Sequence, residues 1–183
     1  MAETKPFTPA KLIVGIISSK DIFFDKAEEA LKALYGAVDL KSPEFSFDLT
    51  DYYEKQMGKN LKRRFLSFVD LVPPEELSSI KVQTNDLESK IRLGLGENFR
   101  VVNVDPGILT TSALIMATAK DFSHRIPLTR GIYAHLEFLF TKSAIRIFDW
   151  TYPDFKQEGY QRFFLDVRRT YLDQLKQLTQ ERR

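Results

Sequence analysis

Apolar residues in the first part of the chain change their spacing from one segment to the next. Residues 12–17 form a continuous apolar run, which is typical of a buried strand. Behind this run the apolar positions recur at helical spacing, and the predicted helix begins at a cap of Ser18 or Ser19 and ends at Gly36. Its predicted buried face consists of Phe23, Ala27, Ala30, Leu31 and Leu34.

The following segments predict two strands, a second helix and one more strand. Residues 45–49 and 61–68 alternate between apolar and polar positions, as expected of strands. The prolines at 73–74, with two glutamates after them, are typical of a helix start, and the glycines within 94–96 are typical of a helix end. Residues 99–104 then predict a strand. The buried stripe predicted for this helix is Leu77, Ile80, Thr84, Leu87 and Ile91.

The rest of the chain predicts more sheet and one long helix. Residues 109–118 suit either a strand or a short helix, and the pattern leaves this choice open. Residues 132–140 alternate, and a turn at 141–143 leads into a strand at 144–148, which completes a hairpin. One face of the first hairpin strand carries Tyr133, His135, Glu137 and Leu139. The final helix has an apolar stripe of Tyr160, Phe163, Phe164, Val167, Tyr171, Leu175 and Leu178.

The order of these elements predicts an α+β fold. Strand, helix, strand, strand, helix, strand over residues 12–105 is the order of a ferredoxin-like split βαβ unit, with both helices expected on one face. We predict that this core is extended by a C-terminal β-hairpin and a long helix. Residues 1–11 predict a flexible tail, and residues 12–183 a single domain.

Composition agrees with a densely packed domain. Of the 183 residues, 43% are hydrophobic and 28% charged, and the 15 Phe and 7 Tyr predict an aromatic core that contains sheet. No apolar run is long enough to span a bilayer, and the first residues lack the apolar centre of a signal peptide. Together with the absence of cysteine, these features predict a cytoplasmic protein with no membrane partner.

Charge and missing motifs exclude several function classes. The 27 Lys and Arg nearly balance the 25 Asp and Glu, and a net charge of +2 predicts no general affinity for nucleic acid. Without cysteine the chain has no disulfide and no thiolate site for zinc or for an iron–sulfur (Fe-S) cluster, and we expect no haem. No GxxxxGK[ST], GxGxxG, HExxH or GxSxG motif is present, so we expect no P-loop nucleotide site.

Polar residues with catalytic potential gather between residues 120 and 133. His124 lies between Asp121 and Arg125 in the sequence, so a neighbouring carboxylate could raise its pKa towards neutrality. We therefore predict His124 and Asp121 as a catalytic pair that exchanges protons with a ligand. The competing interpretation is that a lone histidine in a polar loop is structural or solvated, which is the more common case.

Arginines in the same region predict an anion site. A guanidinium can hold a phosphate or a carboxylate by two parallel hydrogen bonds, and Gly131 would allow a ligand to approach the backbone closely. We predict Arg125, Arg130, Arg64 and Tyr133 as ligand-binding residues.

Three carboxylates could hold Mg²⁺, because oxygen ligands suit this ion. They are Asp48, Asp51 and Glu137. The first two flank Thr50, and the competing interpretation is that they cap the short segment that follows them.

Other polar segments have structural interpretations. The basic residues at 62–64 fall in a predicted strand, where alternation sends Arg63 to the face opposite its two neighbours, and such exposed charges discourage edge pairing. The Asp-Pro-Gly sequence at 105–107 has the composition of a turn behind the strand at 99–104. Residues 150–153 favour a loop packed over the edge of the core.

Six segments form a specific combination that covers nearly the whole chain, from about residue 12 to 175. They are FDLTDYY at 47–53, LKRRF at 61–65, NVDPG at 103–107, KDFSHR at 120–125, RGIY at 130–133 and WTYPD at 150–154. In this combination the chain resembles the bacterial and archaeal family known as domain of unknown function 4416. The resemblance implies no activity or catalytic residue, because none is established for the family. Some members are labelled GTP-binding proteins, but this chain lacks the P-loop and the NKxD motif of GTPases.

Two functions of different classes fit these residues. The first is a pocket protein, and potentially an enzyme, that binds a small phosphorylated or carboxylated ligand. The second is a non-enzymatic interaction domain that stacks single-stranded RNA on exposed aromatic rings or binds a protein partner, including a second copy of the chain as a homodimer. The balanced charge disfavours nucleic acid. An exposed aromatic platform would favour RNA, and a closed cleft with arginine and histidine would favour a small ligand.

Overall fold

A nine-stranded sheet forms the centre of this computed structural model, which describes residues 3–142 and 144–181. Its strands are β1 (Ala10–Ser18), β2 (Val38–Lys41), β3 (Phe45–Ser46), β4 (Lys62–Val72), β5 (Val102–Leu109), β6 (Ala113–Thr118), β7 (Ile126–Pro127), β8 (Tyr133–Phe140) and β9 (Ile145–Ile147). The order is β2-β4-β1-β5-β6-β8-β7, with β3 beside β4 and β9 beside β8. All neighbouring pairs are antiparallel.

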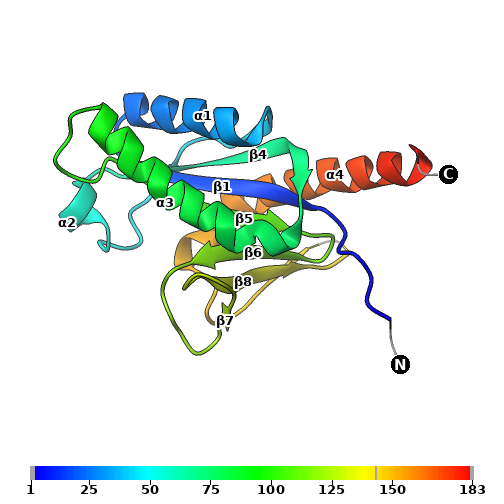
Figure 1. The fold of residues 1–183 in the computed structure, drawn as a ribbon. Helices are drawn as coiled ribbons and strands as arrows, with labels where there is room; N and C mark the ends of the chain where they lie inside the picture. Colours follow the sequence, from blue (N-terminus) through cyan, green and yellow to red (C-terminus); the bar gives the residue numbers. More distant parts are fainter. Residues whose placement is uncertain (1–2, 143, 182–183) are drawn as a thin grey trace.

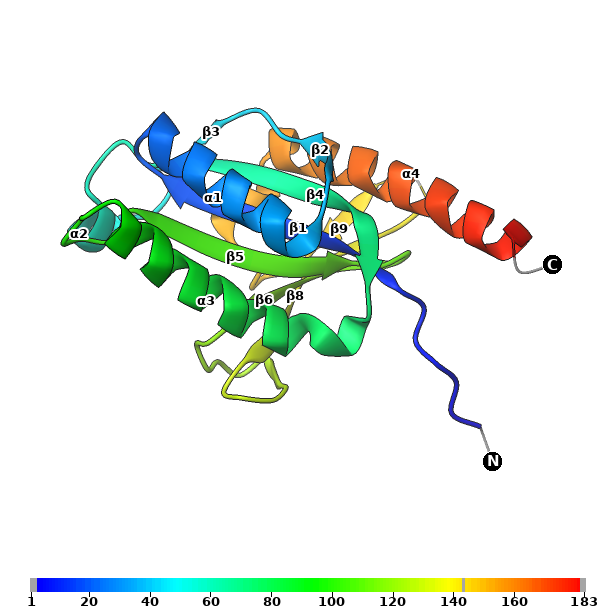
Figure 2. The same ribbon diagram turned by 45° about the horizontal axis from the view of Figure 1, so that its top comes forward.

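Helices cover both faces of this sheet. α1 (Asp21–Tyr35) and α3 (Leu77–Gly94) pack on one face, and α4 (Glu158–Glu181) packs on the other (Figures 1 and 2). Successive residues of β4 serve separate cores, since Leu66 packs with α1 and α3 whereas Phe65 packs with α4. No helix of the described segments is long and apolar enough to cross a membrane. The structure is therefore a mixed α+β fold with a large antiparallel sheet.

The long elements predicted for the first half are present. β1 lies inside the sheet between β4 and β5, and α1 and α3 follow β1 and β4 along the chain. The buried stripe predicted for α3 is confirmed. β2 was not predicted, and the strand predicted at 45–49 is reduced to the two residues of β3. Both differences concern short edge segments, where few residues carry the alternation.

Three local predictions in the same region are wrong. No serine caps α1, because Ser18 still belongs to β1 and its hydroxyl donates to the carbonyl of Val101 at 2.7 Å. Leu34 lies on the exposed side of α1 rather than in the core. The tail ends earlier than predicted, since Lys11 is fully buried in β1, where it pairs with Asp39.

The second half contains the predicted hairpin and long helix. The ambiguous segment at 109–118 forms the strand β6, β8 pairs with β9, and the stripe from Tyr160 to Tyr171 is buried along α4. The turn predicted at 141–143 includes Ser143, which lies outside the described residues. The strict alternation predicted for 132–140 is broken, because the register between β6 and β8 shifts opposite Glu137. This irregularity accompanies the complete burial of Glu137.

The Asp-Pro-Gly segment predicted as a turn belongs instead to β5. β5 pairs with β1 over its whole length, from Val102 to Leu109. β6 pairs with β5 from Gly107 onwards, so the missing N–H of Pro106 falls where no ladder hydrogen bond to β6 is formed. Gly107 is needed where the two strands meet, because a Cβ atom there would lie 2.8 Å from the carbonyl oxygen of Ile115 and would collide with the sulfur of Met116. β5 and β6 are therefore paired only between Gly107 and Leu109 of β5.

Gly107→Ala is expected to destabilise the protein by roughly 1–3 kcal/mol, because the added methyl group overpacks the point where β5 and β6 meet. Gly94→Ala is the matched control, since a Cβ atom at Gly94 would meet nothing within 4 Å. Urea denaturation of both variants measures the difference in the free energy of unfolding. Equal stability of the two variants would contradict the close approach at Gly107.

Candidate functional site

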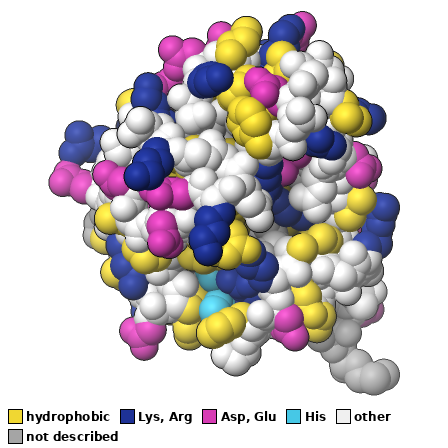
Figure 3. Space-filling model, turned by 90° about the vertical axis from the view of Figure 1, so that its left-hand side faces the viewer, with side chains coloured by type: hydrophobic (Ala, Val, Ile, Leu, Met, Phe, Trp, Pro, Cys, Tyr) yellow, Lys and Arg dark blue, Asp and Glu magenta, His cyan; other side chains and the backbone are white. Residues whose placement is uncertain are grey.

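A cavity of about 540 Å³ opens where β5 and β6 separate. The two strands pair from Gly107 to Leu109 and then diverge, so Asn103 and Asp105 of β5 and Thr118 of β6 line a gap in the sheet. Figure 3 shows this end of the molecule, where Lys and Arg side chains gather around a hollow with histidine atoms beside them. The cavity is of the size that holds drug-sized ligands and nucleotides, about 300–1,000 Å³.

Aromatic side chains from three parts of the chain form much of the lining. They are Phe47, Tyr52 and Tyr53 before or at the start of α2 (Glu54–Met57), Phe65 on β4, and Tyr152 and Phe155 behind β9. Gly15 on β1 lies under Phe65, and a Cβ atom there would approach the ring to 3.0 Å. The cavity can therefore bury the apolar part of a ligand between aromatic walls.

Arg63 and Lys81 are buried cations of the cavity, each with 6% of the residue exposed. Arg63 lies on β4. Its guanidinium pairs with the carboxylate of Asp154, and its Nη2 atom lies 3.7 Å from Asp105. The rings of Phe47 and Phe155 lie 4.7 and 5.4 Å from the guanidinium carbon. The Nε–H of Arg63 has no hydrogen-bond partner among the described residues. A buried charge is costly unless it is paired, so the two carboxylates are required to hold Arg63 in place.

Asp105 connects Arg63 to α3. Its Oδ1 accepts a hydrogen bond from Lys81 Nζ at 3.0 Å, and its Oδ2 accepts one from the side-chain amide of Asn103. Burial disfavours the charged carboxylate, but Lys81 and Arg63 outweigh this effect and hold the pKa of Asp105 below its ordinary value. Asp105 is therefore ionised at neutral pH, with its oxygens occupied by protein donors.

The polar network continues from Asn103 to Glu88 on α3, between this helix and β5. Arg100 donates from Nη2 to the amide oxygen of Asn103 at 2.5 Å and to Glu88 at 2.6 Å. Glu88 also accepts the backbone N–H of Val104 at 2.7 Å. Burial raises the pKa of Glu88, although Arg100 and this N–H act in the opposite direction. Charged and hydrogen-bonded side chains thus connect without a break from Arg63 to Glu88.

Lys120 lies at the mouth of the cavity. Its ammonium is 3.6 Å from the centre of the Tyr52 ring and 5.7 Å from that of Tyr53. Its backbone N–H donates to the hydroxyl of Thr118 at 3.2 Å. Within residues 3–142 and 144–181 the Lys120 ammonium forms no ion pair with a carboxylate. Its charge is therefore available to an anion.

A cluster around His135 forms the wall beside this lysine. The ring of His135 is fully buried and stacks on Tyr152, with centroids 4.7 Å apart and the planes 5° from parallel. Its Nδ1 atom lies 3.2 Å from both His124 Nε2 and Arg125 Nε. On the other side its Nε2 atom lies 3.1 Å from a carboxylate oxygen of Glu137, but the two groups are not aligned as a hydrogen bond.

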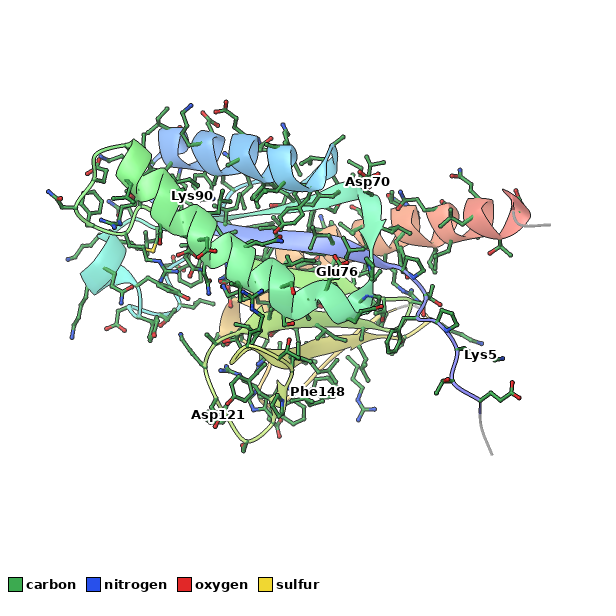
Figure 4. The ribbon with its side chains drawn as sticks, in the orientation of Figure 1. Lys5, Asp70, Glu76, Lys90, Asp121 and Phe148 are labelled. Atoms are coloured by element: carbon green, nitrogen blue, oxygen red, sulfur yellow. The ribbon has the colours of Figure 1, made fainter. Side chains whose placement is uncertain are left out.

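His124 differs from its sequence-based prediction. Burial, followed by the nearby His135 and Arg125, lowers the pKa of His124 below its ordinary value of 6.5. The prediction that Asp121 raises this pKa is therefore wrong. Asp121 is exposed on its loop, at the outer edge of the structure in Figure 4, and is not part of the cavity lining.

The lowered pKa of His124 predicts a loss of stability on acidification. The unfolded chain binds a proton at this residue near pH 6.5, whereas the folded chain binds it only at lower pH. The contribution of His124 to the free energy of unfolding is complete above pH 6.5 and declines as the pH falls towards the folded pKa. Urea denaturation from neutral pH to about pH 5 should give a flatter profile for His124→Asn. If the stability of the wild type and of the variant fell equally with pH, the lowered pKa of His124 would not be the cause of the loss.

The other residues predicted in this region fall into two groups. Arg125 lies beside the cavity, where it contacts His135 and Tyr152. Arg130 and Tyr133 are not among the residues that line the cavity, and Arg130 is exposed in a left-handed backbone conformation with φ of 59°. The structure thus brings one of the two predicted loop arginines to the cavity.

Arg64 lies on the opposite face of β4 from Arg63. It pairs with Glu44 at 2.5 Å, approaches Glu28 at 3.6 Å and lies over the ring of Phe24, 4.6 Å from its centre. These contacts place Arg64 under α1, away from the cavity. Neither arginine is an exposed edge charge, so the solvated-face interpretation of residues 62–64 is wrong for both.

The three predicted magnesium ligands are not brought together as a site. Asp48 and Asp51 are exposed, whereas Glu137 is buried in β8, where burial raises its pKa and it accepts the N–H of Tyr152 at 2.7 Å. Within the described parts of the chain no group of three or more His, Asp or Glu side chains could hold a metal ion. The predicted caps are absent too, since no side chain caps α2 and Thr50 accepts the N–H of Tyr52.

Sequence reasoning missed most of the residues that line the cavity. Arg63 and Asp105 were interpreted as an edge charge and a turn residue, and Asp154 and His135 were not singled out. For the three charged residues one signal was available, since the segments LKRRF, NVDPG and WTYPD of the family resemblance each contribute a charged residue to the lining. His135 lies outside these segments, and it is covered by the ring of Tyr152 and by His124.

Comparison with known proteins agrees with the resemblance seen in the sequence. No curated protein and no solved structure gives a significant match. A family model described as Domain of unknown function (DUF4416) matches residues 8–171, which include every residue that lines the cavity. The chain belongs to the DUF4416 family.

Proposed function

We propose that the cavity binds a small anionic ligand, phosphorylated or carboxylated. The observation that carries this proposal is one cation on the lining that has no carboxylate partner among the described residues. Four basic residues line the cavity, and Arg63, Lys81 and Arg100 pair with Asp154, Asp105 and Glu88. The fourth, Lys120, forms no such pair in the part of the chain that the structure describes and lies over the ring of Tyr52. A ligand rich in acceptors would complement this lining better than a cation would.

Two tyrosine hydroxyls add donors to the same site. Burial and the charge of Asp105 raise the pKa of Tyr53, and burial raises the pKa of Tyr152 to about 12. Both hydroxyls are therefore protonated at neutral pH. The Tyr152 oxygen already accepts a hydrogen bond from Arg125, so its own hydrogen is free to donate. Both hydroxyls can therefore donate a hydrogen bond to an anionic ligand.

The arrangement of aromatic rings supports a small ligand over RNA. α1 and α3 pack on one face of the sheet and α4 packs on the other, so the rings of Phe24, Phe65 and Phe164 are buried between sheet and helices. The cavity rings surround Arg63 in a recess instead of forming a row on an open sheet. Stacking of successive bases requires such a row.

Two further proposals concern the fold type and the location of the protein. We infer that β1, β2, β4 and β5 with α1 and α3 form a ferredoxin-like split βαβ unit, because they repeat its order of elements with both helices on one face. We also propose a cytoplasmic location, based on the absence of cysteine from the sequence.

The proposal predicts stabilisation by anions that depends on Lys120. Phosphate, pyrophosphate or citrate should raise the melting temperature, because a ligand that binds the folded state alone stabilises it by about 2.7 kcal/mol at 100 times its Kd. Lys120→Gln should weaken the affinity about tenfold, the loss typical of one charge-assisted hydrogen bond. Differential scanning fluorimetry over a ligand titration measures both effects.

Arg130→Gln is the matched control, because it removes one positive charge from an exposed residue outside the cavity. Its ligand response should equal that of the wild type. Equal losses in both variants would show that anions bind the surface through general charge attraction, and the cavity assignment would then be wrong.

A further inference from the structure

Each of the three guanidinium nitrogens of Arg125 donates a hydrogen bond within the protein. Its Nε–H donates to His135 Nδ1 at 3.2 Å, Nη1 donates to the backbone carbonyl of Lys120 at 2.7 Å, and Nη2 donates to the hydroxyl of Tyr152 at 2.7 Å. These acceptors lie on β8, on the loop behind β6 and on the segment behind β9. Arg125 therefore connects three segments, and each of them carries a side chain that lines the cavity: His135, Lys120 and Tyr152.

The first of these hydrogen bonds requires a neutral histidine. An arginine side chain only donates hydrogen bonds, so Nδ1 of His135 must present a lone pair to it. The proton of the neutral ring then resides on Nε2, which faces Glu137 at 3.1 Å. Protonation of His135 would place a second N–H against Arg125 and a positive charge beside it. Arg125 can therefore connect these three segments only while His135 is neutral.

Other groups around His135 either favour or disfavour its protonated form. His124 approaches the same Nδ1 atom at 3.2 Å, so a positive charge on its ring would add to the repulsion. Glu137 would stabilise a charged His135 ring, and Tyr152 covers the ring face without a charge at neutral pH. Arg125, which is always charged, lies 3.2 Å from the nitrogen that would receive the proton.

We propose that Arg125 is a positioning residue that holds Lys120 and Tyr152 at the mouth of the cavity, and that it does so only while His135 is neutral. The inference rests on the proposed anion site, whose binding groups it positions. It makes binding at this site sensitive to pH, because protonation of His135 would remove the lone pair to which Arg125 donates. Acidification releases the loop that carries Lys120 and weakens the binding of the anion.

A metal ion between the two histidine rings is the competing interpretation. Ring nitrogens 3.2 Å apart can both ligate one cation, and Glu137 would then orient His135 from behind. The guanidinium of Arg125 donates to the same nitrogen and would repel a cation there. A rise in melting temperature with Zn²⁺, lost in both His124→Asn and His135→Asn, would overturn the proposed role of Arg125.

Pyrophosphate binding, measured by calorimetry at about pH 8 and about pH 5.5, tests the positioning role. Arg125→Lys keeps the charge but loses the planar fork that reaches three acceptors, so it should weaken binding about tenfold at pH 8. The double variant Arg125→Lys/Lys120→Gln should lose less affinity than the product of the two single losses, because Arg125 acts in part through Lys120. Unchanged binding in Arg125→Lys, or losses that multiply in the double variant, would overturn the inference.

A second measurement needs no ligand and separates the two proposals. Arg125→Lys and acidification of the wild type should each speed amide hydrogen exchange at residues 119–125, and Arg130→Gln should not. Trp150 is the only tryptophan and stacks on His124 at 5.1 Å, so its fluorescence reports the same opening. His124→Asn should retain the acid response, because His135 controls it.

The outcomes of these two measurements are distinct. If pyrophosphate fails to bind the wild type while the loop opens as expected, the anion site is wrong for this ligand and Arg125 still positions the loop. If the anion binds but exchange at residues 119–125 is the same in the wild type and in Arg125→Lys, the positioning role is wrong. Loss of the acid response in His124→Asn would assign the sensitivity to His124 and overturn the role of His135.

Discussion

Arg63→Leu is expected to destabilise the protein by about 3–5 kcal/mol, because it leaves buried carboxylates without their partner. Asp154 is 6% exposed and has Arg63 as its ion-pair partner. In the variant Asp105 would keep one ion-pair partner, Lys81. Urea denaturation of the wild type and the variant at neutral pH measures the loss. The loss should diminish as the pH falls and the carboxylates become protonated.

The wild type should show the corresponding acid sensitivity. Arg63 and Lys81 hold the folded pKa of Asp105 below its ordinary value of 3.8, so its contribution to stability is present above that pH and is lost as the pH falls through the folded value. The double variant Arg63→Leu/Asp154→Leu removes both charges of the closest pair and should recover much of the stability. If Arg63→Leu alone is as stable as the wild type, the buried network does not exist as described.

Phe164→Ala is expected to cost about 3–5 kcal/mol in the free energy of unfolding, because the substitution leaves a cavity in the core under α4. Phe164 is fully buried, and its ring lies 4.9 Å from that of Phe65 and 5.5 Å from that of Phe138. Leu165→Ala, one position along the helix at a residue that is 36% exposed, should change stability by less than about 0.5 kcal/mol. Similar losses in the two variants would contradict the orientation of α4.

The sequence predicted the long elements because each carries its own periodicity. The stripes of α3 and α4 repeat over several turns, so the buried residues Leu87 and Phe164 could be identified from their neighbours alone. β1 was recognised in the same way from its continuous apolar run. The short strands β2 and β3 contain too few residues for alternation to be distinguished from chance.

The gap between β5 and β6 could not be predicted from local patterns. Asp-Pro-Gly is typical of a turn, and only the pairing of β5 with β1 and its divergence from β6 make the same residues part of a strand. Likewise, alternation separates Arg63 from Arg64 but does not say which face meets a cavity. Both questions depend on contacts between segments far apart in the chain.

The candidate site was predicted in part, for a physical reason. Residues 120–125 are rich in charge, and His124 and Arg125 do lie beside the cavity, but their partners His135 and Tyr152 come from other segments. Sequence proximity suggested Asp121 as the partner of His124, whereas the loop directs Asp121 to solvent. The sequence shows which residue types lie in this loop, but it does not show which distant segments they contact.

A crystal structure of the protein purified without removal of bound ligands tests the anion site most directly. We predict electron density for a phosphate or carboxylate group in the cavity between β5 and β6, within hydrogen-bonding distance of Lys120 and of Arg63 or a tyrosine hydroxyl. Soaking crystals in pyrophosphate should give the same position if the natural ligand is lost. A cavity that holds only water in both crystals, with the anion bound at Arg130 or elsewhere on the surface, would contradict the account.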